Sequence, residues 1–185
     1  FKGQWIESTG ENSRPHVSVV MNFTKPTESK PALLTYDEVE TFLHEFGHAL
    51  HGMLGEGKYE SQTGTNVYRD FVELPSQLME NWAFDPEVLK QYAVHYRSNE
   101  VIPKYLVDKL RRSELFNQGF MATELIAASL SDMDIHSTTD YEPFDPMVFE
   151  RRALNEKRGL IPQIEPRYRY PYFSHIFDGG YSAGY

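Results

Sequence analysis

Two histidines four residues apart are the clearest candidates for chemistry in this sequence. His44 and His48 lie in the segment Thr41–Leu54, TFLHEFGHALHGML, and on a helix they would share one face, about 6 Å apart. With Glu45 between them they form the pattern H-E-x-x-H, in which two imidazoles bind zinc and the glutamate is the general base. A catalytic zinc uses three protein ligands and a water. The sequence therefore predicts one zinc ion and a third ligand from elsewhere.

The third ligand has two known kinds of source. The pattern H-E-x-x-H-x-x-G-x-x-H requires glycine at position 51 and histidine at position 54. This chain has His51 and Leu54 there, so that pattern is excluded. The other source is a glutamate on a following helix, and segment 68–84, YRDFVELPSQLMENWAF, contains Glu73 and Glu80. Spacing alone leaves both glutamates open.

A capped amphipathic helix is expected to carry the histidines. Thr35 followed by Glu38 reads as a capping box at its start, and Gly55 stands where a glycine would end it. An apolar stripe recurs at helical spacing on the side away from the histidines, and we expect it to pack. The stripe consists of Val39, Leu43, Phe46, Leu50 and Met53.

A second helix is expected over segment 68–84, where Glu73 and Glu80 would lie along one face. Pro75 complicates its start, because proline is comfortable only in the first turn of a helix. Asp70 reads as an N-cap, with a hydrogen bond to a zinc-bound histidine as the alternative. The apolar stripe of this helix consists of Phe71, Leu74, Leu78 and Trp82.

The remaining segments predict a mainly α fold with a small amount of β-strand. Residues 16–23, HVSVVMNF, are the strand candidate, and the glycine-rich segment 55–70 reads as a loop or short hairpin. Three further helical regions follow from their caps and patterns. The first begins at Asp85-Pro86, the second covers residues 101–136 as one or two helices, and the third runs from Asp145-Pro146 to Gly159.

Length and composition predict a single domain over residues 1–185. The net charge of −9 argues against nucleic acid as a partner, since phosphate binding needs clustered Lys and Arg. No apolar run is long enough to cross a membrane. The chain has no cysteine, which excludes disulfides and thiolate ligands. We expect a cytoplasmic location, with the periplasm as an alternative because the N-terminus is missing.

Four motifs together resemble the catalytic core of the thimet oligopeptidase family of zinc metallopeptidases, and most of all its bacterial peptidyl-dipeptidase branch. They are HEFGHALHGML, SQTGTNVYRDFVELPSQLMENWA, PRYRYPYFSHIF and GGYSAGY. The resemblance implies a zincin-like metallopeptidase catalytic domain, of which this chain is a fragment. It also implies that Glu73 is the third zinc ligand, which leaves His51 and Glu80 beside the site.

The family resemblance further implies that His175, Tyr181 and Tyr185 contact the substrate and stabilise the oxyanion. The glycines of HIFDGGYSAGY permit a mobile, close-approaching turn there. In the family the tyrosine-rich run continues beyond this point. Arg167 and Arg169 read as a solvated basic edge, with a carboxylate-binding wall as the alternative.

These features predict a zinc metallopeptidase that hydrolyses short peptides. The expected reaction is release of C-terminal dipeptides by a zinc-activated water, with Glu45 as general base. One alternative is an endo-acting oligopeptidase of the same family, because the catalytic motifs are shared. The other is a non-catalytic peptide-binding module, and the presence of Glu45 argues against it.

Overall fold

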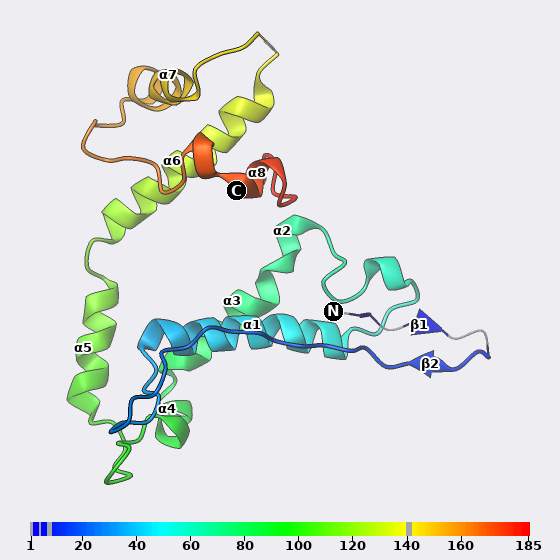
Figure 1. Cartoon of the computed structure of the whole chain (residues 1–185), viewed down its shortest axis with the longest axis vertical. Helices are drawn as coiled ribbons and strands as arrows, with labels where there is room; N and C mark the ends of the chain where they lie inside the picture. Colours follow the sequence, from blue (N-terminus) through cyan, green and yellow to red (C-terminus); the bar gives the residue numbers. More distant parts are fainter. Residues whose placement is uncertain (1, 4, 7–8, 140–141) are drawn as a thin grey trace. The chain divides into compact units, whose positions relative to one another are not determined.

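The structure is a computed structural model that describes residues 2–3, 5–6, 9–139 and 142–185. The predicted mainly α fold class is confirmed, because helices dominate the described residues and strand is confined to two short segments (Figure 1). The helices are α1 (Tyr36–Leu54), α2 (Arg69–Val72), α3 (Leu74–Glu80), α4 (Pro86–Tyr92), α5 (Lys104–Glu114), α6 (Gln118–Ser137), α7 (Pro146–Arg151) and α8 (Ser174–Phe177). None of the described helices is both long and apolar enough to span a bilayer.

The chain divides into two compact units. Unit 1 comprises Phe1–Lys109 and unit 2 comprises Leu110–Tyr185, so the division falls within α5. Each unit is described below by itself. The expectation of a single domain over residues 1–185 stays a prediction.

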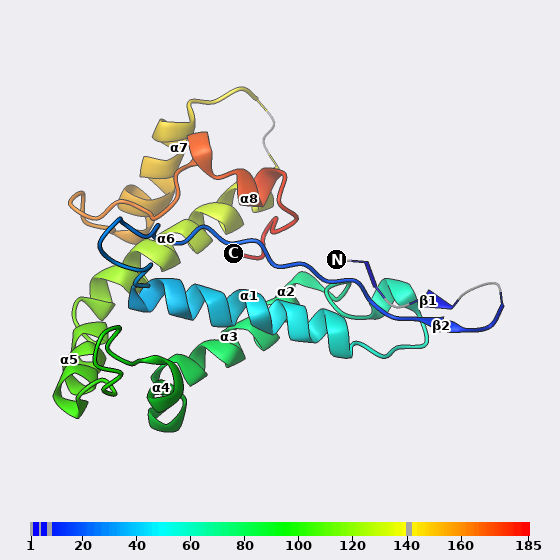
Figure 2. The ribbon, with the colours of Figure 1, turned by 60° about the horizontal axis from the view of Figure 1, so that its bottom comes forward.

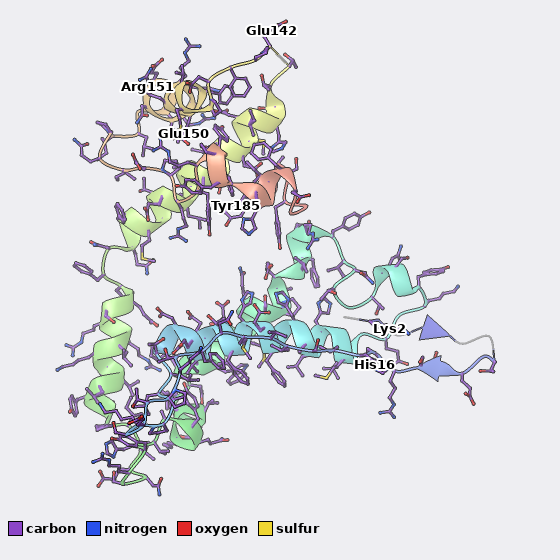
Figure 3. The ribbon with its side chains drawn as sticks, viewed as in Figure 1. Lys2, His16, Glu142, Glu150, Arg151 and Tyr185 are labelled. Carbon is purple, nitrogen blue, oxygen red and sulfur yellow. The ribbon has the colours of Figure 1, made fainter. Side chains whose placement is uncertain are left out.

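Unit 1 begins with a small antiparallel sheet. Strands β1 (Trp5–Ile6) and β2 (Asn12–Ser13) pair with Trp5 opposite Ser13, and a bridge between Lys2 and His16 extends the ladder (Figure 3). The prediction of a strand over residues 16–23 was wrong, because only His16 takes part in a ladder. β-structure requires a hydrogen-bonded neighbour, and an alternating apolar pattern does not supply one.

The expected capping box begins α1. Thr35 Oγ1 accepts a hydrogen bond from Glu38 N (3.2 Å), and the Glu38 carboxylate accepts one from Thr35 N (2.7 Å). Thr24 donates to the same carboxylate from its backbone and its hydroxyl. Gly55 ends the helix with a φ of −63°, which any residue could adopt. Glycine is favoured here because Thr63 lies close: an added Cβ would be 3.0 Å from Thr63 Oγ1.

The apolar stripe of α1 packs less completely than expected. The buried positions of the helix are Gly47 and Ala49, whereas Phe46 and Met53 are about two-fifths exposed. The stripe expected on the following helix is also exposed, with Leu78 at 63%. Helical period identifies an apolar face, but the packing partner must come from another segment, and the described residues leave these faces partly open.

Segment 68–84 forms two short helices and a 3-10 turn (Asn81–Phe84) instead of one continuous helix. The break falls at Glu73, and Pro75 lies in the first turn of α3, where a proline is tolerated. Helix α3 lies directly against α1 (Figures 1 and 2). Gly47 permits this approach, since an added Cβ would be 2.6 Å from Ser76 Cα and 2.7 Å from Pro75 O.

The expected caps outside the site are confirmed. Asp85 accepts hydrogen bonds from the first turn of α4, and Asp145 does the same for α7. A π-helical turn (Arg152–Glu156) continues α7, and Gly159 follows with a φ of +72°. Residues 101–136 form two helices, because Asn117 adopts a left-handed conformation between α5 and α6.

Unit 2 is organised around a small aromatic core. Helix α6 contributes Ala128, and the segment from a 3-10 turn (Tyr170–Tyr172) to α8 contributes Tyr170, Phe173 and Ile176. The Tyr170 hydroxyl donates a hydrogen bond to the Ser131 carbonyl on α6 (2.7 Å), so this buried tyrosine both packs in the core and is hydrogen-bonded to α6. This core fixes the C-terminal segment on α6.

Candidate metal centre

His44, His48 and Glu73 converge on one point in unit 1. Glu73 Oε2 lies 3.3 Å from His44 Nε2 and 3.1 Å from His48 Nε2. All three potential ligand atoms lie within 4.8 Å of one another. Ligand atoms held tetrahedrally about 2.0 to 2.1 Å from a zinc ion are separated by roughly 3.3 to 3.4 Å. The spacing therefore suits a shared zinc ion.

The hydrogen bonds of His44 explain why a cation suits this cluster. Glu80 Oε1 lies 2.6 Å from His44 Nδ1 and accepts a hydrogen bond from its N–H, which leaves the Nε2 of a neutral ring as an acceptor. That acceptor faces the carboxylate oxygen of Glu73, which is also an acceptor. Two acceptors in contact need a proton or a cation between them. A metal ion satisfies both atoms and His48 Nε2 as well.

Two neighbours hold the ligands in place. Ser76 Oγ donates to Glu73 Oε2 and lies the same distance, 2.9 Å, from the Glu73 carbonyl. Ser76 is fully buried and lies three residues after Glu73, at the close contact between α3 and α1. This role of Ser76 was not predicted from sequence, although a serine in the first turn of a helix often hydrogen-bonds to nearby groups at the start of that helix. Glu80 orients the His44 ring, as expected for the glutamate beside the site.

The two remaining candidates near the site, His51 and Asp70, are not part of the ligand cluster. The His51 ring packs edge-on against Phe71, with 6.2 Å between ring centroids. Burial, reinforced by repulsion from His48, lowers the pKa of His51. Asp70 is not an N-cap, because it lies inside α2, whose N-cap is Tyr68.

Glu45 follows the first histidine on α1 and is half-buried. Helical geometry turns it about 100° from His44, so it borders the ligand face without joining it. A carboxylate beside a metal can take a proton from a water molecule. The position of Glu45 is therefore compatible with a general base.

His175, Tyr181 and Tyr185 come together in unit 2, where Figure 3 shows Tyr185 close to α8. The ring centroid of His175 lies 6.4 Å from that of Tyr181 and 6.1 Å from that of Tyr185. Tyr168 also joins this group, with its ring 5.5 Å from Tyr185. Burial and a hydrogen bond with Tyr168 raise the pKa of Tyr185, so its phenol stays protonated and able to donate. Tyr168 was not predicted from sequence.

The arginines of the same segment have different surroundings. Arg169 Nη2 lies 2.7 Å from Oε1 of Glu150, a buried carboxylate, and Nη1 lies 3.2 Å from Glu165 Oε1. The paired carboxylates raise the pKa of Arg169. Arg169 therefore belongs to an internal ion-pair network, which is neither a solvated edge nor an open wall. Arg167 is exposed, as expected for a solvated residue.

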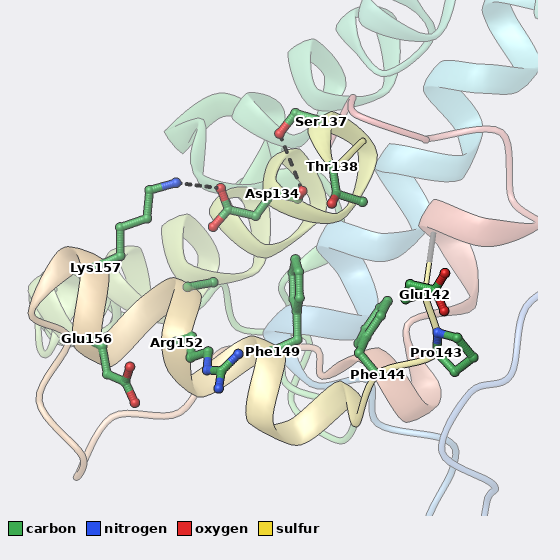
Figure 4. Close-up of a pocket in the computed structure, with 11 residues that line it drawn as sticks. Asp134, Ser137, Thr138, Glu142, Pro143, Phe144, Phe149, Arg152, Glu156 and Lys157 are labelled. Carbon is green, nitrogen blue, oxygen red and sulfur yellow. Dashed lines mark hydrogen bonds and ion pairs between the residues drawn. The ribbon is translucent and has the colours of Figure 1, made fainter. Parts of the chain in front are cut away.

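Unit 2 also contains a hollow of about 770 Å³ (Figure 4). The rings of Phe144 and Phe149 form one side, with centroids 4.9 Å apart. Lys157 is paired with Asp134, and the Ser137 hydroxyl donates to the Asp134 carbonyl. Several polar groups that line the hollow are thus paired with one another. None of the predicted site residues lines it.

Comparison with known proteins agrees with the motifs. The profile of peptidase family M3 matches residues 2–185. The dipeptidyl carboxypeptidase of Escherichia coli (strain K12) is 46% identical over 187 residues, which cover 100% of this chain and 28% of that protein. Oligopeptidase A of the same strain is 38% identical, covering 99% and 27%. A thimet-like oligopeptidase of Dictyostelium discoideum is 42% identical, covering 95% and 26%. The chain thus spans little more than a quarter of these relatives.

Proposed function

This chain belongs to peptidase family M3, and we propose that it supplies the zinc site of a metallopeptidase that hydrolyses short peptides. The dipeptidyl carboxypeptidase and oligopeptidase A among its relatives support this proposal. Neither nucleic acid nor a membrane is part of the proposed activity. The cytoplasmic location stays a prediction.

The observation that carries the proposal is the arrangement around Glu73. Its Oε2 atom faces the Nε2 atoms of His44 and His48 at 3.3 and 3.1 Å, while Glu80 holds the opposite nitrogen of the His44 ring. This arrangement supports His44, His48 and Glu73 as the three ligands of one zinc ion. The fourth position would remain for water or substrate, as a catalytic site requires.

In the proposed mechanism, Glu45 moves the proton. Zinc bound in this cluster would polarise the substrate carbonyl and lower the pKa of a bound water to about 7. Glu45 accepts the proton of the attacking water and delivers it to the leaving amine. Such general acid-base catalysis typically contributes on the order of a hundred- to ten-thousandfold in rate. His175, Tyr181 and Tyr185 are the proposed donors to the substrate and its oxyanion.

We further propose that the intact enzyme releases C-terminal dipeptides. The name of the 46% identical relative, dipeptidyl carboxypeptidase, supports this specificity. The second candidate is endo-acting cleavage within short peptides, because oligopeptidase A matches the same residues at 38% identity. Both reactions use the same water chemistry, so they differ only in recognition of the free carboxylate.

A pair of peptides distinguishes the two reactions. For this experiment a hybrid enzyme is made, in which this chain replaces the matching segment of the Escherichia coli dipeptidyl carboxypeptidase. The hybrid is given one peptide sequence with either a free or an amidated C-terminus. Loss of a charge-assisted contact is worth about 1.5 to 3 kcal/mol, so amidation should lower kcat/KM roughly ten- to hundredfold. Equal cleavage of the amidated peptide into internal fragments would favour the endo-acting alternative. No hydrolysis of either peptide by a zinc-loaded hybrid would contradict the proposed function.

A further inference from the structure

Asp132 of α6 is a buried carboxylate that reaches the C-terminal turn of the chain. It is 1% exposed, and its two oxygens accept hydrogen bonds from the backbone of that turn. Oδ1 accepts from Ala183 N at 2.9 Å, and Oδ2 accepts from Tyr185 N at 3.0 Å. The two contacts cross more than 50 positions of sequence, so they join separate elements of unit 2.

The turn has a backbone conformation that needs support. Ala183 has a φ of +53°, which is uncommon for a residue with a Cβ, and Gly180 has a φ of +78°. Backbone N–H groups brought together in such turns form a concave site for an anion. Here the Asp132 carboxylate fills the site that Ala183 N and Tyr185 N create.

Asp132 is itself held firmly. His136, one turn later on α6, has its Nδ1 atom 2.8 Å from Asp132 Oδ1. The preceding residue, Ser131, accepts the buried hydroxyl of Tyr170 through its carbonyl. The opposite end of the turn is tied to α8, because the carbonyl of His175 accepts from Tyr181 N at 3.2 Å. The turn is therefore fixed at both ends within unit 2.

We propose that Asp132 is a positioning residue that holds Tyr181 and Tyr185 in the orientation required for contact with substrate. The catalytic part of this inference rests on the proposed function, whereas the structural part does not. Because each carboxylate oxygen takes one N–H of the turn, an amide cannot replace Asp132: asparagine would present an N–H₂ group to one of these donors. The mobile turn expected from its glycines is then an anchored one.

Amide hydrogen exchange of the zinc-loaded chain, followed by NMR, tests the anchor. In the wild-type chain, Ala183 N and Tyr185 N should exchange at least about tenfold more slowly than in an unstructured peptide. In Asp132→Asn both should approach the unstructured rate to within about threefold. Asp134→Asn is the matched control: it removes an acid from the same helix that pairs with Arg158, and the turn should stay protected.

Two exchange results would overturn the proposal. The first is free exchange of these amides in the wild-type chain, a measurement that needs no variant to fold. The second is full protection in Asp132→Asn. Either result would show that the carboxylate does not hold the turn.

Peptide hydrolysis by the zinc-loaded hybrid enzyme described above, with the same substitutions in this chain's segment, tests the positioning role. Asp132→Asn should lower kcat at least about tenfold and change KM by less than about threefold, with zinc content unchanged. Asp134→Asn should keep kcat. A loosened turn with kcat preserved would overturn the positioning role. If the hybrid with the wild-type segment hydrolysed nothing, the proposed function would fail, and the exchange experiment on the chain would still decide the anchor.

Discussion

The orientation of one imidazole ring prepares this cluster for a metal ion. Glu80 accepts a hydrogen bond from Nδ1–H of His44, so the Nε2 lone pair points toward Glu73 and His48. Hydrogen bonds of this kind fix the tautomer of a ligand histidine and increase its basicity. Ser76 gives Glu73 a comparable constraint from the opposite side. Five polar side chains thus prepare a site that none of them could form alone.

Replacement of Glu45 with glutamine separates metal binding from catalysis. Glutamine is nearly isosteric but cannot accept the proton of the attacking water. We expect Glu45→Gln to keep the wild-type zinc content and to lower kcat by about a hundred- to ten-thousandfold. The measurement is kcat at equal zinc occupancy in the hybrid enzyme described above. A variant that kept more than half of the wild-type kcat would exclude Glu45 as the base.

At the scale of single residues, much of the candidate site could be predicted from the sequence. The spacing of His44 and His48 with Glu45 was sufficient for a zinc hypothesis, and family resemblance chose Glu73 over Glu80. The supporting contacts of Ser76, Tyr168 and Asp132 were missed. Each depends on a partner outside its own motif or on a turn geometry that residue spacing does not specify.

At the scale of helices, the site depends on the distance between α1 and α3. The two helices approach closely at Gly47, where the three atoms nearest to an added Cβ are backbone atoms of Pro75 and Ser76. Backbone cannot rotate away, as a flexible side chain would. Substitution of Gly47 must therefore separate the helices, and Glu73 would move with α3.

We expect Gly47→Ala to destabilise the chain despite the higher helix propensity of alanine. Overpacking typically costs about 1 to 3 kcal/mol, and alanine in a helix recovers about 1 kcal/mol. Zinc affinity should fall as well. Gly119→Ala in α6 is the control, because an added Cβ there meets nothing within 4 Å. Denaturant unfolding of both variants checks this, and equal stability with unchanged zinc affinity in Gly47→Ala would contradict the account.

The ion pair between Asp134 and Arg158 predicts a pH dependence for α6. Hydrogen bonds from Arg158 lower the pKa of Asp134, so the pair stabilises the fold above the unfolded pKa of about 4. This contribution disappears as the pH falls through the lower, folded pKa. Asp134→Asn should cost about 1.5 to 3 kcal/mol at pH 7 and much less near pH 2. Urea unfolding at the two pH values measures the difference, and an equal cost at both would exclude this origin.

Sequence patterns predicted helix starts better than helix packing. Thr35, Asp85 and Asp145 each cap a helix as expected, because a cap is decided within a few residues. The strand over residues 16–23 and the buried stripe of α1 were predicted less well. Both require a partner segment, and local sequence carries no information about that partner.

For the whole molecule, we expect the 185-residue chain to bind zinc but to be a poor peptidase. The proposed ligands all lie between His44 and Glu73, whereas the chain spans only 28% of the Escherichia coli relative. Loss of one oxyanion donor typically costs about 2.7 to 4 kcal/mol, or a hundred- to thousandfold in rate. The chain and the hybrid enzyme should differ by at least this factor on one short peptide. Rates within about threefold would mean that the remaining segments are dispensable.

The most direct test of the proposed metal centre is a zinc titration of the whole chain against a competing chelator. The wild-type chain should bind one zinc ion. Glu73→Ala should bind it at least about a hundredfold more weakly, whereas Glu80→Ala, which removes only the hydrogen bond to His44, should lose about ten- to a hundredfold. Full zinc affinity in Glu73→Ala, with affinity abolished in Glu80→Ala, would contradict the assignment of Glu73 as the third ligand.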